Sequence, residues 1–367
     1  MSTAPTTSPF RIGVLTSGGD CPGLNAVIRS TVCAAARRDW EVLGFSDGYE
    51  GLLSPVRYRK LTEENTMGIT GLGGTILGTT NKGRFVAKVG MGEKALIPAA
   101  IIDEARATLE GLDIRALVCI GGDGSLTTAQ QLFESGIPTV GVPKTIDNDI
   151  SATATSFGFD SAVECVTDAL DRLHTTAASH KRVMVVEVMG RHAGWIALHG
   201  GLAGGANAIL IPEIPFSHEK LAAFIRRRVG DGQPTTMVVV AEGAKASDGE
   251  VVTHKSPSGV GEARLGGIGQ EVTKRIEELT GRETRCMVLG HLQRGGAPTT
   301  LDRILGTRFG VGAVKMIAEG KFGQMVTYRN HLIGEVTIAE AVGQLQLVPP
   351  DGQTVAAARA MGISFGD

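Results

Sequence analysis

The stretch "RALVCIGGDGSLTTAQQLFES" (115–135) decides the fold class. After Arg115, the apolar run "ALVCI" predicts a strand. A glycine-rich turn follows, and a helical pattern extends from about Leu126 to Ser135. A strand that leads through a tight turn into a helix is the building unit of α/β proteins. Such a turn exposes backbone N–H groups at the positive end of a helix, where an anion can bind.

The same unit recurs along the chain. Near-continuous apolar strands that alternate with helices are typical of parallel sheets covered on both faces. We therefore predict two doubly wound, Rossmann-like α/β domains, each with three layers and a mostly parallel sheet, with ligands bound at the carboxyl ends of the strands. The other predicted strands cover 11–16, 41–45, 137–142, 182–188, 206–211, 235–243, 283–290 and 323–328, and further helices cover 24–38 and 161–179.

Composition narrows the function classes. Of 367 residues, 42% are hydrophobic, which is enough for large cores, and the formal net charge of −2 gives no support for binding to nucleic acid or a membrane surface. The five cysteines are dispersed without CxxC pairs, as expected of reduced thiols in a cytosol. Neither a signal peptide nor a membrane span is expected, so we predict a cytoplasmic protein.

A second glycine turn follows the first predicted strand, in "LTSGGDCPGLNAVIR" (15–29). Gly18 and Gly19 would let backbone N–H groups approach an anion closely, although a turn that needs positive φ explains them equally well. In the turn at 121–124, Asp123 stands beside the expected phosphates. A carboxylate there repels the phosphates unless a divalent cation lies between them. Asp123 is therefore a candidate Mg²⁺ ligand, or else it caps the following helix.

Charged side chains gather after other strands. "PKTIDND" (143–149) combines a cation with several carboxylates, which suits phosphoryl transfer. The same sequence is also typical of a turn rich in Asp and Asn whose charges are solvated. Arginines match phosphate geometry with two parallel hydrogen bonds. The charged candidates are Lys144, Asp147, Asp149, Arg182, Arg191, His192, Glu242, Arg285, His291 and Arg294.

Taken in order, these motifs resemble the bacterial-type 6-phosphofructokinase family. The resemblance extends from about Ile12 to about residue 350 and is carried by "GVLTSGGDCPGLNAVIR", "GGDGS", "PKTIDND", "VVEVMGRHAGW" and "LGHLQRGGAPTTLDRILGTRFG". It implies Mg²⁺-dependent transfer of a phosphoryl group from ATP to the 1-hydroxyl of fructose 6-phosphate. It also implies a donor domain, 1–158 plus 293–343, and a sugar-phosphate domain, 159–292 plus 344–367.

The resemblance also implies residue roles. Asp147 would be the general base, Thr145 and Arg191 would hold the transferring phosphoryl group or the sugar, and Gly18 would donate its N–H to that group. The resemblance places Arg182 and Arg285 in the site of a neighbouring subunit, within a homotetramer. The remaining sugar contacts would be Met189, Gly190, Glu242, His291 and Arg294, and the donor contacts Tyr49, Lys82, Arg84, Gly122, Asp123, Gly124, Ser125 and Lys144.

Several positions depart from the family pattern or leave alternatives open. Gly124 leaves room for a nucleotide, whereas Lys144 is typical of relatives that use diphosphate, so a diphosphate-dependent enzyme is the alternative to an ATP-dependent one. Asn81 stands where an arginine is usual, and Lys82 or Arg84 is expected to replace it. Tyr49 either stacks on adenine or packs a loop.

Further observations concern the regulation of the enzyme and the other enzyme classes to which the chain could belong. Arg29 matches one basic residue of the family's effector site, but Cys33, His174 and 230–236 lack the others, so control by ADP or phosphoenolpyruvate is not assumed. A lipid or dinucleotide kinase also carries a GGDG turn but lacks "PKTIDND". A dehydrogenase is disfavoured because no GxGxxG follows the first strand.

Overall fold

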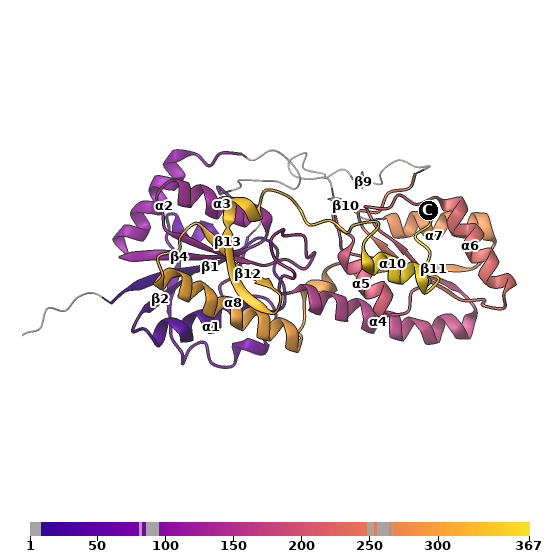
Figure 1. Ribbon diagram of the computed structural model, residues 1–367, viewed down its shortest axis with the longest axis horizontal. Coiled ribbons are helices and arrows are strands. Elements are labelled where there is room, and N and C mark those ends of the chain that lie inside the picture. The colour runs from indigo at the N-terminus through magenta and orange to yellow at the C-terminus, as the bar shows by residue number, and fades with distance from the viewer. Residues whose placement is uncertain (1–8, 81–82, 86–94, 248–252, 255–263, 266) are drawn as a thin grey trace, which may run out of the picture. The chain divides into compact units, whose positions relative to one another are not determined.

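The computed structural model describes residues 9–80, 83–85, 95–247, 253–254, 264–265 and 267–367. The chain forms two compact units and is of the predicted α/β class (Figure 1). Unit 1 extends to Thr145 and also contains Ile150–Gly158 and Gly296–Gln344. Unit 2 contains Ile146–Asp149, Phe159–Gly295 and Leu345–Asp367, so the middle of the "PKTIDND" loop packs with this second unit.

Unit 1 is built on a seven-stranded sheet in the order β13-β12-β5-β4-β1-β2-β3. Its five inner strands are parallel, and β3 and β13 pair antiparallel at the two edges. The strands are β1 (Arg11–Ser17), β2 (Glu41–Phe45), β3 (Tyr58–Leu61), β4 (Ile114–Gly121), β5 (Thr139–Pro143), β12 (Gln324–Arg329) and β13 (Leu332–Thr337).

Helices cover both faces of this sheet, which explains why six consecutive residues of β1 and of β4 are buried. Figure 1 shows α2 and α3 on one side of the sheet and α1 and α8 on the other. Thr299 caps α8 by accepting a hydrogen bond from the Asp302 N–H at 3.2 Å. The helical segments are α1 (Leu24–Ala36), α2 (Ala99–Gly111), α3 (Asp123–Glu134), α8 (Thr300–Ala318) and α9 (Ile338–Ala341), with the 3₁₀ turns η1 (Gly48–Leu52) and η2 (Ile69–Gly71).

Strand order fixes where unit 1 can bind a ligand. The chain leaves β1 for β2 on one side and later enters β4 on the other side, so the connections diverge between β1 and β4. In open α/β sheets, this divergence leaves a crevice at the carboxyl ends of the two strands. The two glycine turns follow those ends, at Ser17 and Gly121.

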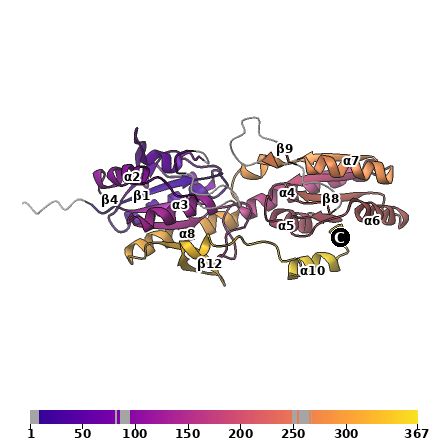
Figure 2. The same ribbon diagram turned by 90° about the horizontal axis from the view of Figure 1, so that it is seen from above.

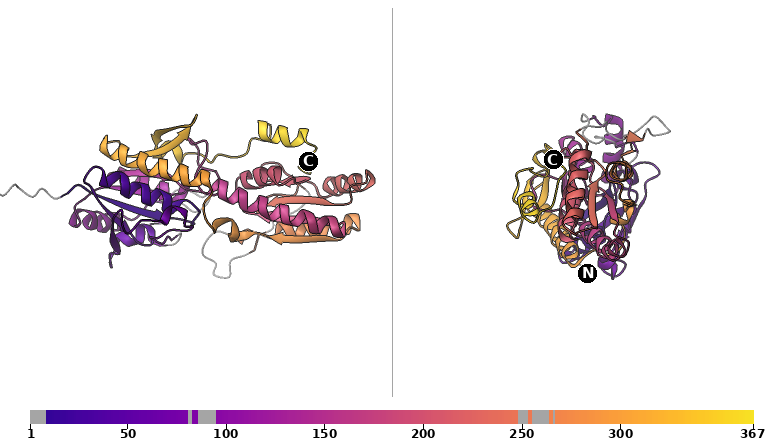
Figure 3. Two further views of the ribbon diagram at one scale, coloured as in Figure 1. Left: turned by 90° about the horizontal axis from the view of Figure 1, so that it is seen from below. Right: turned by 90° about the vertical axis from the view of Figure 1, so that its right-hand side faces the viewer.

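Unit 2 contains a four-stranded parallel sheet in the order β11-β6-β8-β7 and a short antiparallel pair, β9 with β10. Helices α4 and α5 cover one face and α6 and α7 the other; α4 is the long magenta helix in the left view of Figure 3. Helix α10 packs beside α5 (Figure 2). The strands are β6 (Val183–Val188), β7 (Ala208–Leu210), β8 (Thr236–Ala241), β9 (Thr253–His254), β10 (Arg264–Leu265) and β11 (Thr284–Val288).

The helical segments of unit 2 are α4 (Phe159–His180), α5 (Trp195–Ala203), α6 (His218–Gly230), α7 (Ile268–Thr280), α10 (Gln353–Ala360) and the 3₁₀ turn η3 (Gly290–Arg294). Because β8, β6 and β11 are neighbours and parallel, the residues after their carboxyl ends meet at one edge of the sheet. Across the described parts of both units, no helix combines the length and apolar character that crossing a bilayer requires.

Candidate active site

In unit 1, the two glycine turns lie against each other. Gly18 has a φ of +82°, and a Cβ at this position would lie 3.2 Å from Ser125 Oγ and 3.5 Å from Lys144 Nζ. The backbone conformation therefore favours glycine, and a Cβ would also crowd the Ser125 hydroxyl. The Gly18 N–H donates to the carbonyl of Thr80 at 3.0 Å. In this conformation the Gly18 N–H is therefore bonded to a neighbouring loop, and its contact with a phosphoryl group stays a prediction.

Lys144 ties the turns together. Its ammonium donates to the Gly19 carbonyl, and its backbone N–H donates to the Gly121 carbonyl at 2.9 Å. Only 4% of the residue is exposed. The side chain thus brings a positive charge to the point where the glycine turns after β1 and β4 converge.

Asp123 is the first residue of α3, and the N-cap position belongs to Gly122, which makes no side-chain capping bond. Asp123 is therefore not the N-cap residue of α3. A carboxylate in the first turn is favourable beside the positive end of a helix. Among the described residues, no group of three or more His, Cys, Asp or Glu side chains is placed to hold a metal ion. One carboxylate does fit Mg²⁺, which commonly binds one or two carboxylates together with substrate phosphates and water.

Tyr49 packs inside unit 1 in this structure. The residue is 3% exposed, its hydroxyl donates to the Ser125 carbonyl at 2.8 Å, and its ring packs on Phe85 with 5.5 Å between centroids. The ring is enclosed by protein in this conformation, which favours the loop-packing alternative, and the adenine contact stays a prediction. Arg84 forms an ion pair with Glu50, with Nε and Oε2 3.2 Å apart.

Two positions of the same loop, Asn81 and Lys82, lie outside the described residues. The structure therefore gives no account of the predicted basic contact at Lys82.

The "PKTIDND" loop combines buried residues with two partly exposed carboxylates. Lys144, Ile146 and Asn148 are buried, whereas Asp147 and Asp149 are partly exposed. The backbone bends at Ile146 and Asp147, and Asn148 has a left-handed φ of +52°. One oxygen of the Asp147 carboxylate, Oδ1, is buried, so this carboxylate is only partly open to solvent.

In unit 2, the turn after β6 packs on the turn after β8. The Gly243 N–H donates to the Gly190 carbonyl at 3.1 Å, and the Glu242 N–H donates to the Val188 carbonyl at 2.8 Å. A Cβ on Gly243 would lie 2.0 Å from the Arg191 carbonyl oxygen, so only glycine fits there. The predicted sugar contacts at 189–191 and Glu242 are therefore brought together.

The third part of this cluster is η3, which carries His291 and Arg294. Gln293, 1% exposed, accepts a hydrogen bond from the Met189 N–H at 3.3 Å and donates to the Gly290 carbonyl at 3.0 Å. It thus holds η3 against the end of β6. Sequence reasoning missed Gln293; the only signal was an uncharged amide between two basic residues.

Electrostatics link the members of this cluster. Burial raises the pKa of Glu242, the negative charge of Glu187 raises it further, and the positive charges of Arg191 and Arg294 act in the opposite direction. Glu187 is itself buried and accepts the Gly269 N–H at 2.8 Å, at the start of α7. Sequence reasoning also missed Glu187, because a lone acid at the end of an apolar strand gave no pattern.

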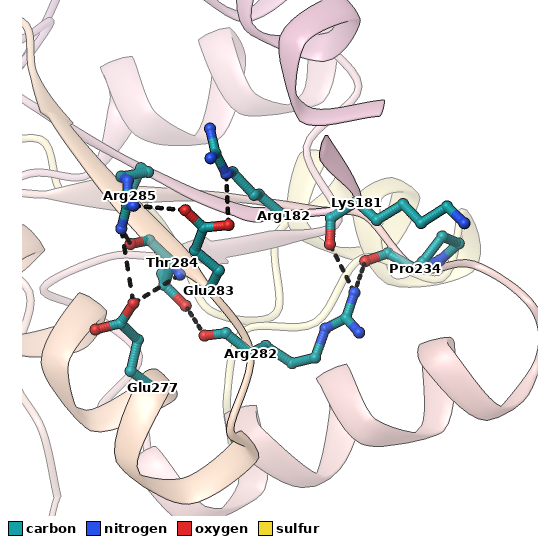
Figure 4. A network of polar contacts seen from close by, with 8 residues as sticks. All are labelled: Lys181, Arg182, Pro234, Glu277, Arg282, Glu283, Thr284 and Arg285. Carbon is teal, nitrogen blue, oxygen red and sulfur yellow. Dashed lines mark hydrogen bonds and ion pairs between the residues drawn. The ribbon is translucent and has the colours of Figure 1, made fainter. Parts of the chain in front are cut away.

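Arg182 and Arg285 do not join this cluster. Figure 4 shows both side chains on Glu283: Arg182 Nε lies 2.8 Å from Glu283 Oε2, and an Arg285 nitrogen lies 2.5 Å from Oε1. Arg182 precedes the first residue of β6, whereas Met189 follows the last, a separation of about 20 Å at the usual rise per residue of a strand. Within one subunit, these two arginines lie at the opposite ends of the strands from the cluster.

A family model described as phosphofructokinase matches residues 11–317. The chain belongs to the phosphofructokinase family. Among family members, the chain is 52% identical to an ATP-dependent 6-phosphofructokinase of Chloroflexus aurantiacus, over 97% of this chain and 98% of that protein. It is 48% identical to a pyrophosphate–fructose 6-phosphate 1-phosphotransferase of Amycolatopsis methanolica, over 93% of this chain and 97% of that one.

The solved phosphofructokinase of Saccharomyces cerevisiae superposes with a TM-score of 0.78 at 31% identity. The match covers 96% of this chain but only 46% of the yeast chain. The chain therefore spans less than half of that structural relative, and its fold is that of the family.

Proposed function

We propose that the chain is an ATP-dependent 6-phosphofructokinase, which transfers the terminal phosphoryl group of ATP to the 1-hydroxyl of fructose 6-phosphate and so forms fructose 1,6-bisphosphate and ADP in glycolysis. The observation that carries this proposal is the convergence of two glycine turns and Lys144 at the start of α3. Backbone N–H groups, a helix N-terminus and one cation together suit a chain of phosphates.

In the donor half of the proposed site, Gly122, Gly124 and Ser125 would line the phosphates. Asp123 would hold Mg²⁺, which neutralises part of the phosphate charge when it is bound. Its place in the first turn of α3 supports this role, since the same helix end attracts the anion and tolerates the carboxylate.

In the acceptor half, Asp147 would take the proton of the sugar hydroxyl, and Thr145 and Arg191 would hold the transferring group. Glu242 would accept hydrogen bonds from the sugar hydroxyls. Met189, Gly190, His291 and Arg294 would complete the sugar site. The packing of the turns after β6 and β8 and of η3 supports this grouping.

Arg182 and Arg285 would bind the sugar 6-phosphate in the site of a neighbouring subunit, within a homotetramer. Their distance from Met189 along β6 supports a role outside their own subunit's site. We also propose a cytoplasmic location, because dispersed cysteines suit a reducing compartment.

The phosphoryl donor is the part of the proposal that most needs a test, because close relatives carry names of both kinds. The purified chain is assayed with fructose 6-phosphate and Mg²⁺, with ATP in one arm and diphosphate in the other. Gly124 leaves space beside the phosphates, so we expect kcat/KM with ATP to exceed that with diphosphate. Activity with diphosphate alone would overturn the assignment of ATP as the donor.

A further inference from the structure

A short segment around Gln346 contacts separate parts of unit 2. The Gln346 N–H donates to the backbone carbonyl of Asp149 at 2.8 Å. The Gln346 carbonyl accepts the indole N–H of Trp195 at 2.8 Å. Two residues on, the Val348 N–H donates to Glu213 Oε1 at 2.9 Å. The segment therefore joins the loop that carries Asp149 to the start of α5.

Glu213 extends this connection to the turn after β6. Its carboxylate oxygens accept the Gly194 N–H at 3.0 and 3.2 Å. Gly194 is tightly enclosed, because a Cβ there would lie 2.4 Å from Ile211. It is also the N-cap residue of α5 and stands three positions after Arg191. One carboxylate thus fixes both this turn and the Gln346 segment.

The stretch beyond α10 is also attached to unit 2. The Ile209 N–H donates to the Ser364 carbonyl and the Ser217 N–H to the Gly366 carbonyl, each at 2.8 Å. Val348 itself is buried. The contacts of the Gln346 segment therefore belong to the packed body of unit 2.

We infer that Gln346–Val348 is a brace that fixes the Asp147 loop and the Arg191 turn relative to each other, with Trp195 and Glu213 as its positioning residues. The inference rests on the roles proposed above for Asp147 and Arg191. Neither Trp195 nor Glu213 is a catalytic residue, because each acts through the backbone of a neighbouring loop.

The brace matters because phosphoryl transfer depends on positioning more than on covalent chemistry by the protein. A displacement of about 1 Å at reacting groups can cost about 10²-fold in rate. Asp147 is two residues from the carbonyl that Gln346 holds. A loosened brace should therefore lower kcat with little effect on either KM.

The first test replaces the indole donor. Trp195→Phe removes the N–H to Gln346 and keeps an aromatic ring beside His199, 5.9 Å away between centroids. The matched control is Trp40→Phe, which changes the only other tryptophan, located in unit 1 against Phe10. We expect about a tenfold loss of kcat in the first variant and wild-type kcat in the control. The inference is overturned by wild-type kcat in Trp195→Phe, or by a loss of kcat that merely follows the loss of Tm.

The second test uses graded changes at Glu213. Glu213→Gln keeps one acceptor oxygen and should retain most of kcat, whereas Glu213→Met removes both acceptors and should match Trp195→Phe. Because both residues act on one segment, the double variant Trp195→Phe/Glu213→Met should lose less than the sum of the single losses in ΔΔG. Strictly additive losses would mean that the two residues act separately, and the brace would be rejected.

A third measurement does not depend on turnover. In a Trp40→Phe background, Trp195 is the sole tryptophan. Adding Glu213→Met should shift its emission to longer wavelength, because the indole N–H loses its fixed partner and meets water. Unchanged emission overturns the brace. If the wild-type chain transfers no phosphoryl group from any donor, the proposed function fails, and this emission measurement alone then decides the inference.

Discussion

At the scale of single residues, the carboxylates of the candidate site differ through their surroundings more than through their own chemistry. Asp123 sits at the start of α3, whereas Asp147 and Asp149 flank the buried Asn148 in a bent loop. Glu242 is half-buried beside Glu187, which is fully enclosed. Environment of this kind decides which acid holds a metal, which takes a proton and which accepts hydrogen bonds.

Asp147→Ser tests the assignment of the base. We expect kcat to fall by at least about 10²-fold, with only a modest change in KM for fructose 6-phosphate, because general base catalysis is typically worth this much. The measurement is steady-state kinetics with ATP at saturation. Asp168→Ser is the matched control, since Asp168 lies on the exposed face of α4, 3.0 Å from Arg172, in a pair expected to contribute little. Near-normal turnover in Asp147→Ser would mean that another group removes the proton.

Glu242 gives a prediction about pH. Burial and the Glu187 charge raise its pKa above the usual 4.5, so the side chain takes up a proton at a higher pH than an ordinary glutamate does. Below that pKa the carboxylate loses its charge and binds hydroxyl groups more weakly. KM for fructose 6-phosphate should therefore rise as pH falls through the raised pKa.

The control for this pH effect is Glu242→Gln, whose side chain does not titrate. Any pH dependence of KM that remains in this variant arises from other groups, including the phosphate of the sugar. Glu187→Gln should move the midpoint to lower pH, because it removes a neighbouring negative charge. A midpoint that stays in place in Glu187→Gln would contradict the coupling between the two carboxylates.

At the scale of elements, apolar runs predicted the inner strands of both sheets, because those strands are buried on both faces. The same criterion missed the edge strands β3 and β13, in which most residues are exposed or half-buried and no apolar run forms. The candidate site residues could be predicted from the motifs and from their positions at strand ends. Their contact partners could not be predicted. The sequence around Tyr49, for example, would be the same whether its ring is buried or exposed, and only the packing of the folded chain decides between the two.

Tyr49→Phe tests how η1 supports α3. It removes the hydroxyl that donates to the Ser125 carbonyl, so the unfolding free energy should fall by about 1 kcal/mol. Because the first turn of α3 forms the proposed phosphate site, KM should rise severalfold for ATP and for diphosphate alike. Thermal unfolding and donor kinetics measure the two effects. Tyr58→Phe is the control, since Tyr58 is 45% exposed. An unchanged donor KM would instead fit a ring that stacks on adenine, because phenylalanine keeps that contact.

At the scale of the whole molecule, each unit places its candidate residues after the carboxyl ends of its own parallel strands. That much follows from the strand order and could be predicted from sequence, because ligands of open α/β sheets bind there. Arg182 and Arg285 break the rule, since both lie near the starts of their strands, held on Glu283. The physical explanation we propose is that their ligand belongs to a second copy of the chain.

Subunit complementation tests this shared site. Arg182→Ala should raise KM for fructose 6-phosphate strongly, and Asp147→Ser should lower kcat, so each variant alone is nearly inactive at low substrate. If the two are mixed under conditions that exchange subunits, some sites combine an intact Asp147 from one chain with an intact Arg182 from its neighbour. Random exchange at equal amounts should restore about a quarter of the wild-type sites, because each half of a site is intact with a probability of about one half. Two matched mixtures are the controls: each variant with itself, and Arg182→Ala with Arg285→Ala, which leaves one arginine or the other missing from every site. No recovery in the first mixture, after subunit exchange has been verified by mass spectrometry, would place Arg182 outside the neighbour's site.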